Sequence, residues 1–139
     1  MDNYTAFKSF LDDEGIRYEE DSFDSGDRFL SIPQKIKSGA LVNVVIVFSK
    51  TKIKVLIVGI ANVEDEDKIG AYYELFNSYN VEYAFFKMYV RQNGICVDGD
   101  FSLEICDGEF VPKELMGFIA SALFSVDKVY RDIMKIQWL

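Results

Sequence analysis

The sequence predicts an α+β fold in which helices pack on one face of an antiparallel sheet of about five strands. Apolar residues recur at helical spacing in three segments, which cover residues 3–14, 62–79 and 112–134. Strand-like segments occur in neighbouring pairs with short turns between them, and such hairpins build antiparallel sheets. Within residues 72–91 helical spacing changes sharply to strand-like spacing, so one helix leads directly into a strand. The expected order is therefore helix, three strands, helix, two strands, helix.

Length and composition indicate one folded domain over residues 1–139, because half of the residues are hydrophobic. The formal net charge of −8 argues against nucleic acid and against an anionic membrane surface as partners. It is compatible with a basic or hydrophobic protein partner. No apolar run approaches the roughly 20 residues that span a bilayer, and the acidic start lacks the features of a signal peptide. We therefore expect a cytoplasmic protein whose two cysteines, Cys96 and Cys106, are reduced.

The first helix is expected from Asn3 to Glu14, with Asn3 as its N-cap and Gly15 in the left-handed position that ends it. The acidic segment Arg17–Ser22 has the composition of an exposed edge strand. A turn follows, and the strand that begins at Arg28 is expected to be broken by Pro33, because proline cannot donate to a central ladder.

The segment Leu41–Phe48 is apolar at nearly every position, so we expect both of its faces to be covered. Helices would cover one face, and a partner or a second copy would cover the other. The segment Lys52–Ile60 alternates more clearly and completes a hairpin with it, although Leu56 and Val58 make its polar face apolar towards the end.

The second helix is expected to begin at Asn62, with the acidic run Glu64–Asp67 near its positive N-terminal end. Asn77 and Asn80 are expected at its junction with the next strand, since asparagine tolerates the conformation that ends a helix.

A second hairpin is expected from Val81–Gln92 and Ile95–Ile105 across the turn Asn93-Gly94. The run Asp98-Gly99-Asp100 suggests a bulge in its second strand. Pro112 then opens the last helix, which has the longest apolar stripe of the chain.

The residue types exclude several kinds of catalytic site. The chain has no histidine, so it can form neither a Ser-His-Asp nor a Cys-His arrangement, and two cysteines are too few for structural zinc. Neither phosphate-binding glycine motif is present. We predict no catalytic residue, no cofactor and no metal. The acidic clusters Asp21/Asp24/Asp27 and Asp98/Asp100 leave a carboxylate- and metal-dependent hydrolase as an alternative, although solvated acids are the simpler interpretation.

Three stretches carry a resemblance to a known family: FKSFLDDEGIRYEED from Phe7, ELFNSYNVEYAFFKMYVRQNGICVDGDFSLE from Glu74, and VDKVYRDIMKI from Val126. The chain resembles the YbjN family of small bacterial proteins. The second stretch is similar to the family's Leu-Asn-x-x-Asn-like element, here carried by Leu75, Asn77 and Asn80. The resemblance implies a fold like that of type III secretion chaperones and a role in sensory transduction regulation. It implies no catalytic residues.

These observations favour a non-enzymatic protein-binding module, either chaperone-like or a regulatory adaptor of the YbjN type. An accessory or immunity-type protein that binds one basic cognate partner is the second interpretation, and the hydrolase is the third. A homodimer is expected because the second face of the sheet is apolar. Six apolar residues are the candidate contacts with a partner or dimer mate: Val44, Ile46, Phe48, Phe86, Met88 and Trp138.

Overall fold

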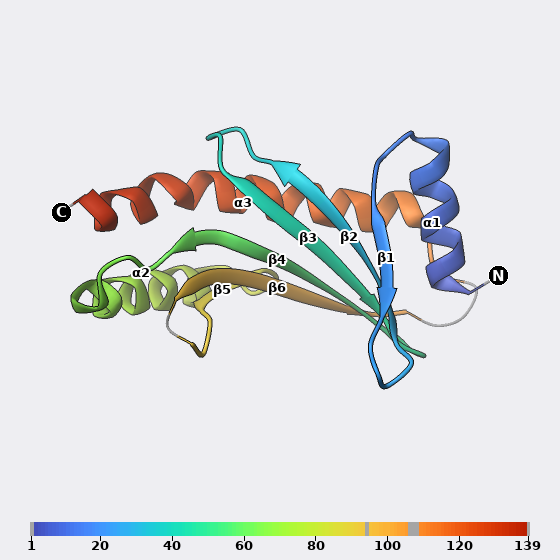
Figure 1. Ribbon diagram of the computed structural model, residues 1–139, viewed down its shortest axis with the longest axis horizontal. Helices are drawn as coiled ribbons and strands as arrows, with labels where there is room; N and C mark the ends of the chain where they lie inside the picture. The colour runs from blue at the N-terminus through green and yellow to red at the C-terminus, as the bar shows by residue number, and fades with distance from the viewer. Residues whose placement is uncertain (1, 94, 106–108, 139) are drawn as a thin grey trace.

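The described residues form a six-stranded antiparallel sheet with helices on one face (Figure 1). The structure is a computed structural model and describes residues 2–93, 95–105 and 109–138. The helices are α1 (Asn3–Asp13), α2 (Ile69–Glu82) and α3 (Pro112–Trp138), with a short 3₁₀ helix, η1 (Glu66–Lys68), before α2. The strands are β1 (Glu19–Ser22), β2 (Arg28–Lys35), β3 (Leu41–Phe48), β4 (Lys52–Asn62), β5 (Lys87–Val90) and β6 (Cys96–Glu104). The spatial order is β1-β2-β3-β4-β6-β5. The α+β prediction is confirmed, and the acidic β1 supplies a sixth strand.

The inner face of the sheet packs against the helices, as shown by α3, which runs behind the strands in Figure 1. Alternate residues of β3 point to this face, from Val42 to Phe48, and all of them are buried. Phe48 lies against the rings of Tyr4 and Phe7 of α1. The predicted stripe on α3 supplies the opposite side of the core, with Leu115, Ile119, Ala122, Val126, Val129 and Ile133 buried. Each buried leucine, isoleucine or valine of this stripe contributes about 2 kcal/mol when it leaves water.

The N-cap of α1 is Asp2 rather than Asn3. The carboxylate of Asp2 accepts a hydrogen bond from the backbone amide of Thr5 at 2.8 Å, and Asp2 has the extended backbone of a cap residue. The predicted end of the helix is confirmed, because Gly15 has φ +70° and the amide of Ile16 donates to the carbonyl of Leu11.

Strand β2 does not break at Pro33 but continues to Lys35, with Pro33 opposite Asn43 of β3. Strand β1 pairs only with residues 28–31 of β2, so no described strand lies beside Pro33 on the other edge of β2. A proline is tolerated at such an edge because no ladder hydrogen bond is lost there.

The predicted bulge lies in β4 rather than in β6. Ile57 is opposite Gly99 and Ala61 is opposite Val97, so three residues of β4 face the single residue Asp98. Gly59 lies within this bulge with φ +76°, a conformation that other residues rarely adopt. The extra residues bend β4 where it pairs with β6.

The junction between the second helix and the next strand differs from the prediction. Strand β4 extends to Asn62, and Asp65 caps η1 by accepting from the amide of Asp67. Helix α2 ends at Glu82, so Asn77 and Asn80 both lie inside it, and β5 occupies only Lys87–Val90 of the expected strand.

The side chain of Asn80 explains this arrangement. Its carboxamide accepts from the backbone amide of Met88 at 3.0 Å and donates to the carbonyl of the same residue at 2.8 Å. The ammonium group of Lys87 donates to the carbonyls of Asn80 and Tyr83 at the end of α2. The side chain of Asn80 thus makes the hydrogen bonds to β5 that a neighbouring strand would otherwise make along its outer edge. The predicted hairpin of β5 and β6 is confirmed, while Gly94 of its predicted turn lies outside the described residues.

Candidate binding surfaces

Five of the six candidate contact residues lie inside the chain's own core. Val44, Ile46 and Phe48 point to the inner face of β3, and Phe86 and Met88 are buried beside β6. The expectation that these five side chains meet a partner is wrong, because α1, α2 and α3 already cover the face to which they point. The sixth residue, Trp138, lies at the end of α3 and is 80% exposed.

The outer face of the sheet carries the apolar side chains that the prediction missed. Val45 and Leu56 are directly opposite each other on β3 and β4, and Val47 is opposite Phe29 of β2. These side chains and Val58 are half-buried and lie outside the core cluster. None of the described helices packs on this face. The predicted apolar character of both faces of Leu41–Phe48 therefore holds, but the chain itself covers only one of them.

Charged groups of both signs border this apolar area, which we call the outer face. Glu19 and Asp21 lie along β1 on one side. On the other side Lys54 lies 3.9 Å from the carboxylate of Asp100, which also accepts a hydrogen bond from the hydroxyl of Tyr89 at 2.8 Å. Burial and that bond to Asp100 raise the pKa of Tyr89. The border is thus mixed in charge rather than uniformly acidic.

Asp98 is not the solvated acid that the sequence suggested. It is only 5% exposed and accepts two hydrogen bonds from the guanidinium of Arg91, at 2.7 and 2.9 Å. It also accepts from the amide of Gly59 at 3.0 Å, in the bulge of β4. The hydrogen bonds to Asp98 raise the pKa of Arg91. All polar contacts of this carboxylate are internal, so its role in this structure is to hold β4, β5 and β6 together.

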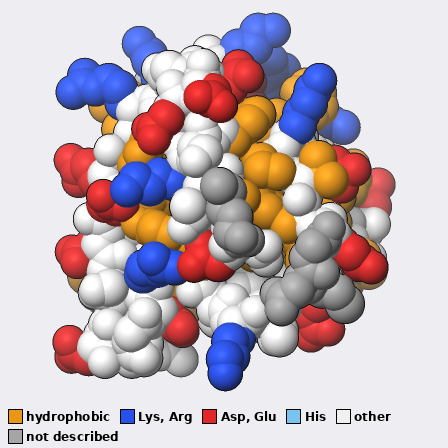
Figure 2. Space-filling model, turned by 90° about the vertical axis from the view of Figure 1, so that its right-hand side faces the viewer, with side chains coloured by type: hydrophobic (Ala, Val, Ile, Leu, Met, Phe, Trp, Pro, Cys, Tyr) orange, Lys and Arg blue, Asp and Glu red, His pale blue; other side chains and the backbone are white. Residues whose placement is uncertain are grey.

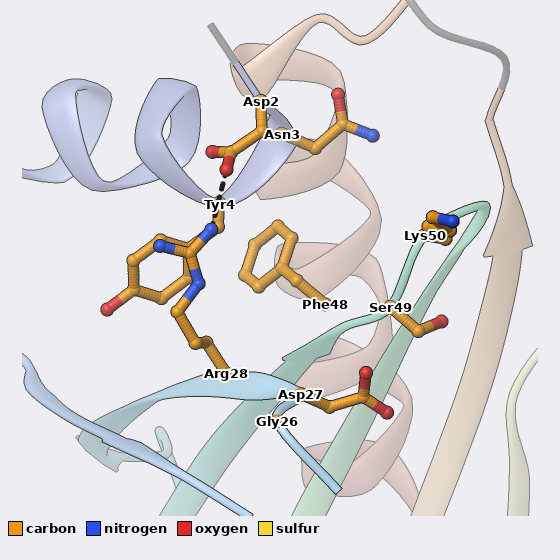
Figure 3. Close-up of a pocket in the computed structure, with 9 residues that line it drawn as sticks. All are labelled: Asp2, Asn3, Tyr4, Gly26, Asp27, Arg28, Phe48, Ser49 and Lys50. Carbon is orange, nitrogen blue, oxygen red and sulfur yellow. Dashed lines mark hydrogen bonds and ion pairs between the residues drawn. The ribbon is translucent and has the colours of Figure 1, made fainter.

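A polar hollow of about 330 Å³ lies at the N-terminal end of α1, between that helix and the turns that precede β2 and β4 (Figure 3). The guanidinium of Arg28 lies 4.1 Å from the centre of the Tyr4 ring and 2.6 Å from the carboxylate of Asp2. Hydrogen bonds from Thr5, together with Arg28, lower the pKa of Asp2 to about 2. Burial and the bond to Glu20 raise the pKa of Tyr4 to about 12.

The polar side chains of this hollow bind other groups of the protein and do not form a catalytic arrangement. The hydroxyl of Ser49 donates to the carbonyl of Lys52 at 3.1 Å and not to a base. Arg28 is held by Asp2 and Tyr4. At this end of the molecule acidic and basic side chains are interspersed around exposed apolar ones (Figure 2).

The other predicted chemistry finds no assembled site in the described part of the chain. No group of three or more acidic or cysteine side chains is placed to hold a metal ion there. Cys96 is partly exposed and not in a disulfide, whereas Cys106 lies outside the described residues. Among the helices as described, none is long and apolar enough to cross a membrane.

The arrangement of helices and strands in this chain is similar to that of a solved bacterial protein structure. Its fold matches the crystal structure of YbjN from E. coli, described as a candidate transcription regulator, with a TM-score of 0.67. The match covers 98% of this chain and 94% of YbjN at 13% sequence identity, so it shows the fold alone. No protein-family model matches the sequence, and a search of curated proteins found no match. The YbjN-like fold that the resemblance implied is thus confirmed at the level of structure.

Proposed function

We propose that the chain is a non-enzymatic protein-binding module, a regulatory adaptor that acts in the bacterial cytoplasm. The observation that carries this proposal is the outer face, where Val45, Val47, Leu56 and Val58 lie on a sheet surface that none of the described helices covers. Removing such an apolar area from water is favourable in free energy, and contiguous apolar patches of this kind mark interaction sites. The likeness to YbjN, described as a candidate transcription regulator, supports a regulatory role.

A second copy of the chain is the occupant that we propose for the outer face. Its border has acids on β1 and a lysine on β4, so a two-fold axis parallel to the strands would place the acids of each copy near the lysine of the other. A strongly basic partner would instead meet Lys54 at the same border. The dimer would present the remaining surface, including Trp138, to other proteins.

Affinity capture tests the protein-binding role. The tagged protein would be captured from a lysate of its own host at low and at high salt, beside an unrelated acidic protein of similar size. We expect one stoichiometric partner that the acidic control does not retain. Enrichment of nothing above the control would contradict the proposal. A rise in melting temperature with Mg²⁺, Ca²⁺ or Mn²⁺ would favour the carboxylate-dependent hydrolase instead.

A further inference from the structure

One side of α3 is followed by three adjacent hollows, of about 200, 240 and 510 Å³. Phe118 lines the first hollow, and its ring lies 5.2 Å from that of Phe85, which lines the second. The second and third hollows share Tyr79 and Tyr83 of the α2 end. We call this row of hollows the α3 groove. Residues three or four apart on one helical face form its floor: Glu114, Phe118, Ser121, Ser125, Lys128 and Asp132.

The α3 groove gathers exposed apolar side chains that are otherwise scattered. Of the eleven large apolar side chains that are exposed in the described part of the chain, five line it: Tyr83, Phe85, Val111, Phe118 and Phe124. Phe124 is 70% exposed, and Ser121 and Ser125 leave space beside it. Single exposed apolar residues need no explanation, but a contiguous set in a hollow is typical of an interaction site.

The charges around the α3 groove determine which occupant fits. Five acids line it, Glu82, Glu104, Glu109, Glu114 and Asp132, and Lys128 is the only base in the lining. Of these acids only Asp132 has an ion-pair partner among the described residues, Lys135 at 3.9 Å. A second copy docked groove to groove would place five acids against five acids. The α3 groove is therefore matched to a basic segment and not to itself.

We propose that the α3 groove binds a basic amphipathic helix of a partner protein, which rests on the protein-binding role proposed above. The floor from Glu114 to Asp132 is about 27 Å long at 1.5 Å per residue, enough for a helix of about five turns. Apolar residues at i, i+3, i+4 and i+7 of that helix enter successive hollows, where Phe118 and Phe124 contact them. Lysines or arginines beside this stripe meet the five acids.

The first test uses a defined probe. It is a fluorescein-labelled peptide of about 18 residues, with leucines at i, i+3, i+4 and i+7 spacing, lysines beside them and alanines elsewhere. Its twin has glutamate at every lysine position. Fluorescence anisotropy with the full chain is expected to show saturable, salt-sensitive binding of the lysine peptide and none of the twin.

Matched variants localise the binding. Phe124→Ser is expected to weaken it about tenfold, as for a residue that contributes more than 1 kcal/mol to an interface. Leu41→Ser is the control, because Leu41 is 74% exposed at the start of β3 and does not line the groove. The charge pair is Glu82→Lys with Glu114→Lys, which is expected to weaken binding strongly. Asp13→Lys with Glu14→Lys changes the net charge equally at the exposed end of α1, away from both proposed surfaces, and is expected to change affinity less than about twofold.

Several results would overturn the proposal. If both charge-reversal pairs weaken peptide binding equally, the peptide is attracted by the overall acidity of the protein and not by the groove. If Phe124→Ser leaves the affinity for the peptide unchanged, the groove is not the binding site. The absence of saturable binding up to about 1 mM would also overturn the proposal. Self-association that Phe124→Ser abolishes would assign the groove to a second copy. If the partner captured from lysate is retained by Phe124→Ser, the protein-binding role stands and the α3 groove is not its site.

Discussion

At the scale of the residue, the region where β4, β5 and β6 meet depends on two small features. Asp98 is the buried charged side chain of the described core and joins Arg91 to the bulge at Gly59. Gly99, its neighbour, leaves the space that the ring of Phe86 occupies. The sequence predicts both residues to be parts of an exposed bulge. The pattern Asp-Gly-Asp is ordinary in turns, and only the tertiary contacts of Arg91 and Phe86 show otherwise.

Gly99→Ala is expected to destabilise the fold by about 2 kcal/mol, as for overpacking of a core. A β-carbon there would lie 2.3 Å from Cζ of Phe86 and 2.9 Å from the carbonyl oxygen of Lys87. Gly117→Ala is the control, since a β-carbon on this α3 residue meets nothing within 4 Å and alanine favours a helix. Urea unfolding should therefore show opposite changes in the free energy of unfolding. Equal effects would contradict the packing at Gly99.

The cap at Asp2 gives a pH dependence. The folded chain lowers the pKa of Asp2 to about 2, below its ordinary value, so the carboxylate stabilises the fold above about pH 4. That contribution is lost as the pH falls from about 4 to 2, through the folded pKa. Asp2→Ala should cost about 1 kcal/mol near neutral pH, and less in acid. Melting curves of the wild type and of Asp2→Ala across this pH range test the prediction. A difference in melting temperature between the two proteins that stays constant into acid would contradict it.

At the scale of the element, the helix spacing was the most informative part of the sequence. The stripe from Leu115 to Ile133 predicted α3 correctly, since its residues keep one face over the whole helix. The boundary between α2 and β5 was not predictable from local pattern. It depends on the bonds of Asn80 to Met88, eight residues further along the chain, which have no local signature.

Asn80→Ala should destabilise the docking of β5 by about 2 kcal/mol, because the amide and the carbonyl of Met88 both lose their partner. Hydrogen exchange at the Met88 amide should become faster. Asn77→Ala is a matched control on the same helix, because Asn77 is exposed, and its effect should stay within about 0.5 kcal/mol. Similar exchange rates in the two variants would argue against this role of Asn80.

The candidate contacts illustrate the limit of sequence reasoning for a strand that is apolar on both faces. Successive residues of β3 point to opposite sides, and the sequence predicted that one set meets a partner. The sequence alone does not show which set the helices cover, so the prediction that Val44, Ile46 and Phe48 face a partner names the wrong face. The exposed polar residue Asn43 and the apolar Leu56 and Val58 were the available signals for the outer face.

At the scale of the whole molecule, the packing of the helices on the sheet leaves two different surfaces exposed, the outer face and the α3 groove. Because α1, α2 and α3 lie on the inner face, the outer face retains apolar side chains with a border of mixed charge. Because α2 and α3 meet at the β5 end of the sheet, a groove with acidic walls is left along α3. The two surfaces differ in charge, so we assign them different occupants: a second copy for the outer face and a basic helix for the α3 groove.

The mass of the protein in solution tests the central claim about the outer face most directly. Light scattering at high micromolar concentration should give twice the 16.0 kDa of one chain for the wild type. It should give a single chain for Val45→Thr with Leu56→Thr, which keeps strand-forming residues but removes apolar area. The control, Val81→Thr with Ile95→Thr, removes apolar area from two exposed residues that lie on neither proposed surface, and it should remain a dimer. A monomeric wild type, or a double variant Val45→Thr/Leu56→Thr that still dimerises, would contradict the account.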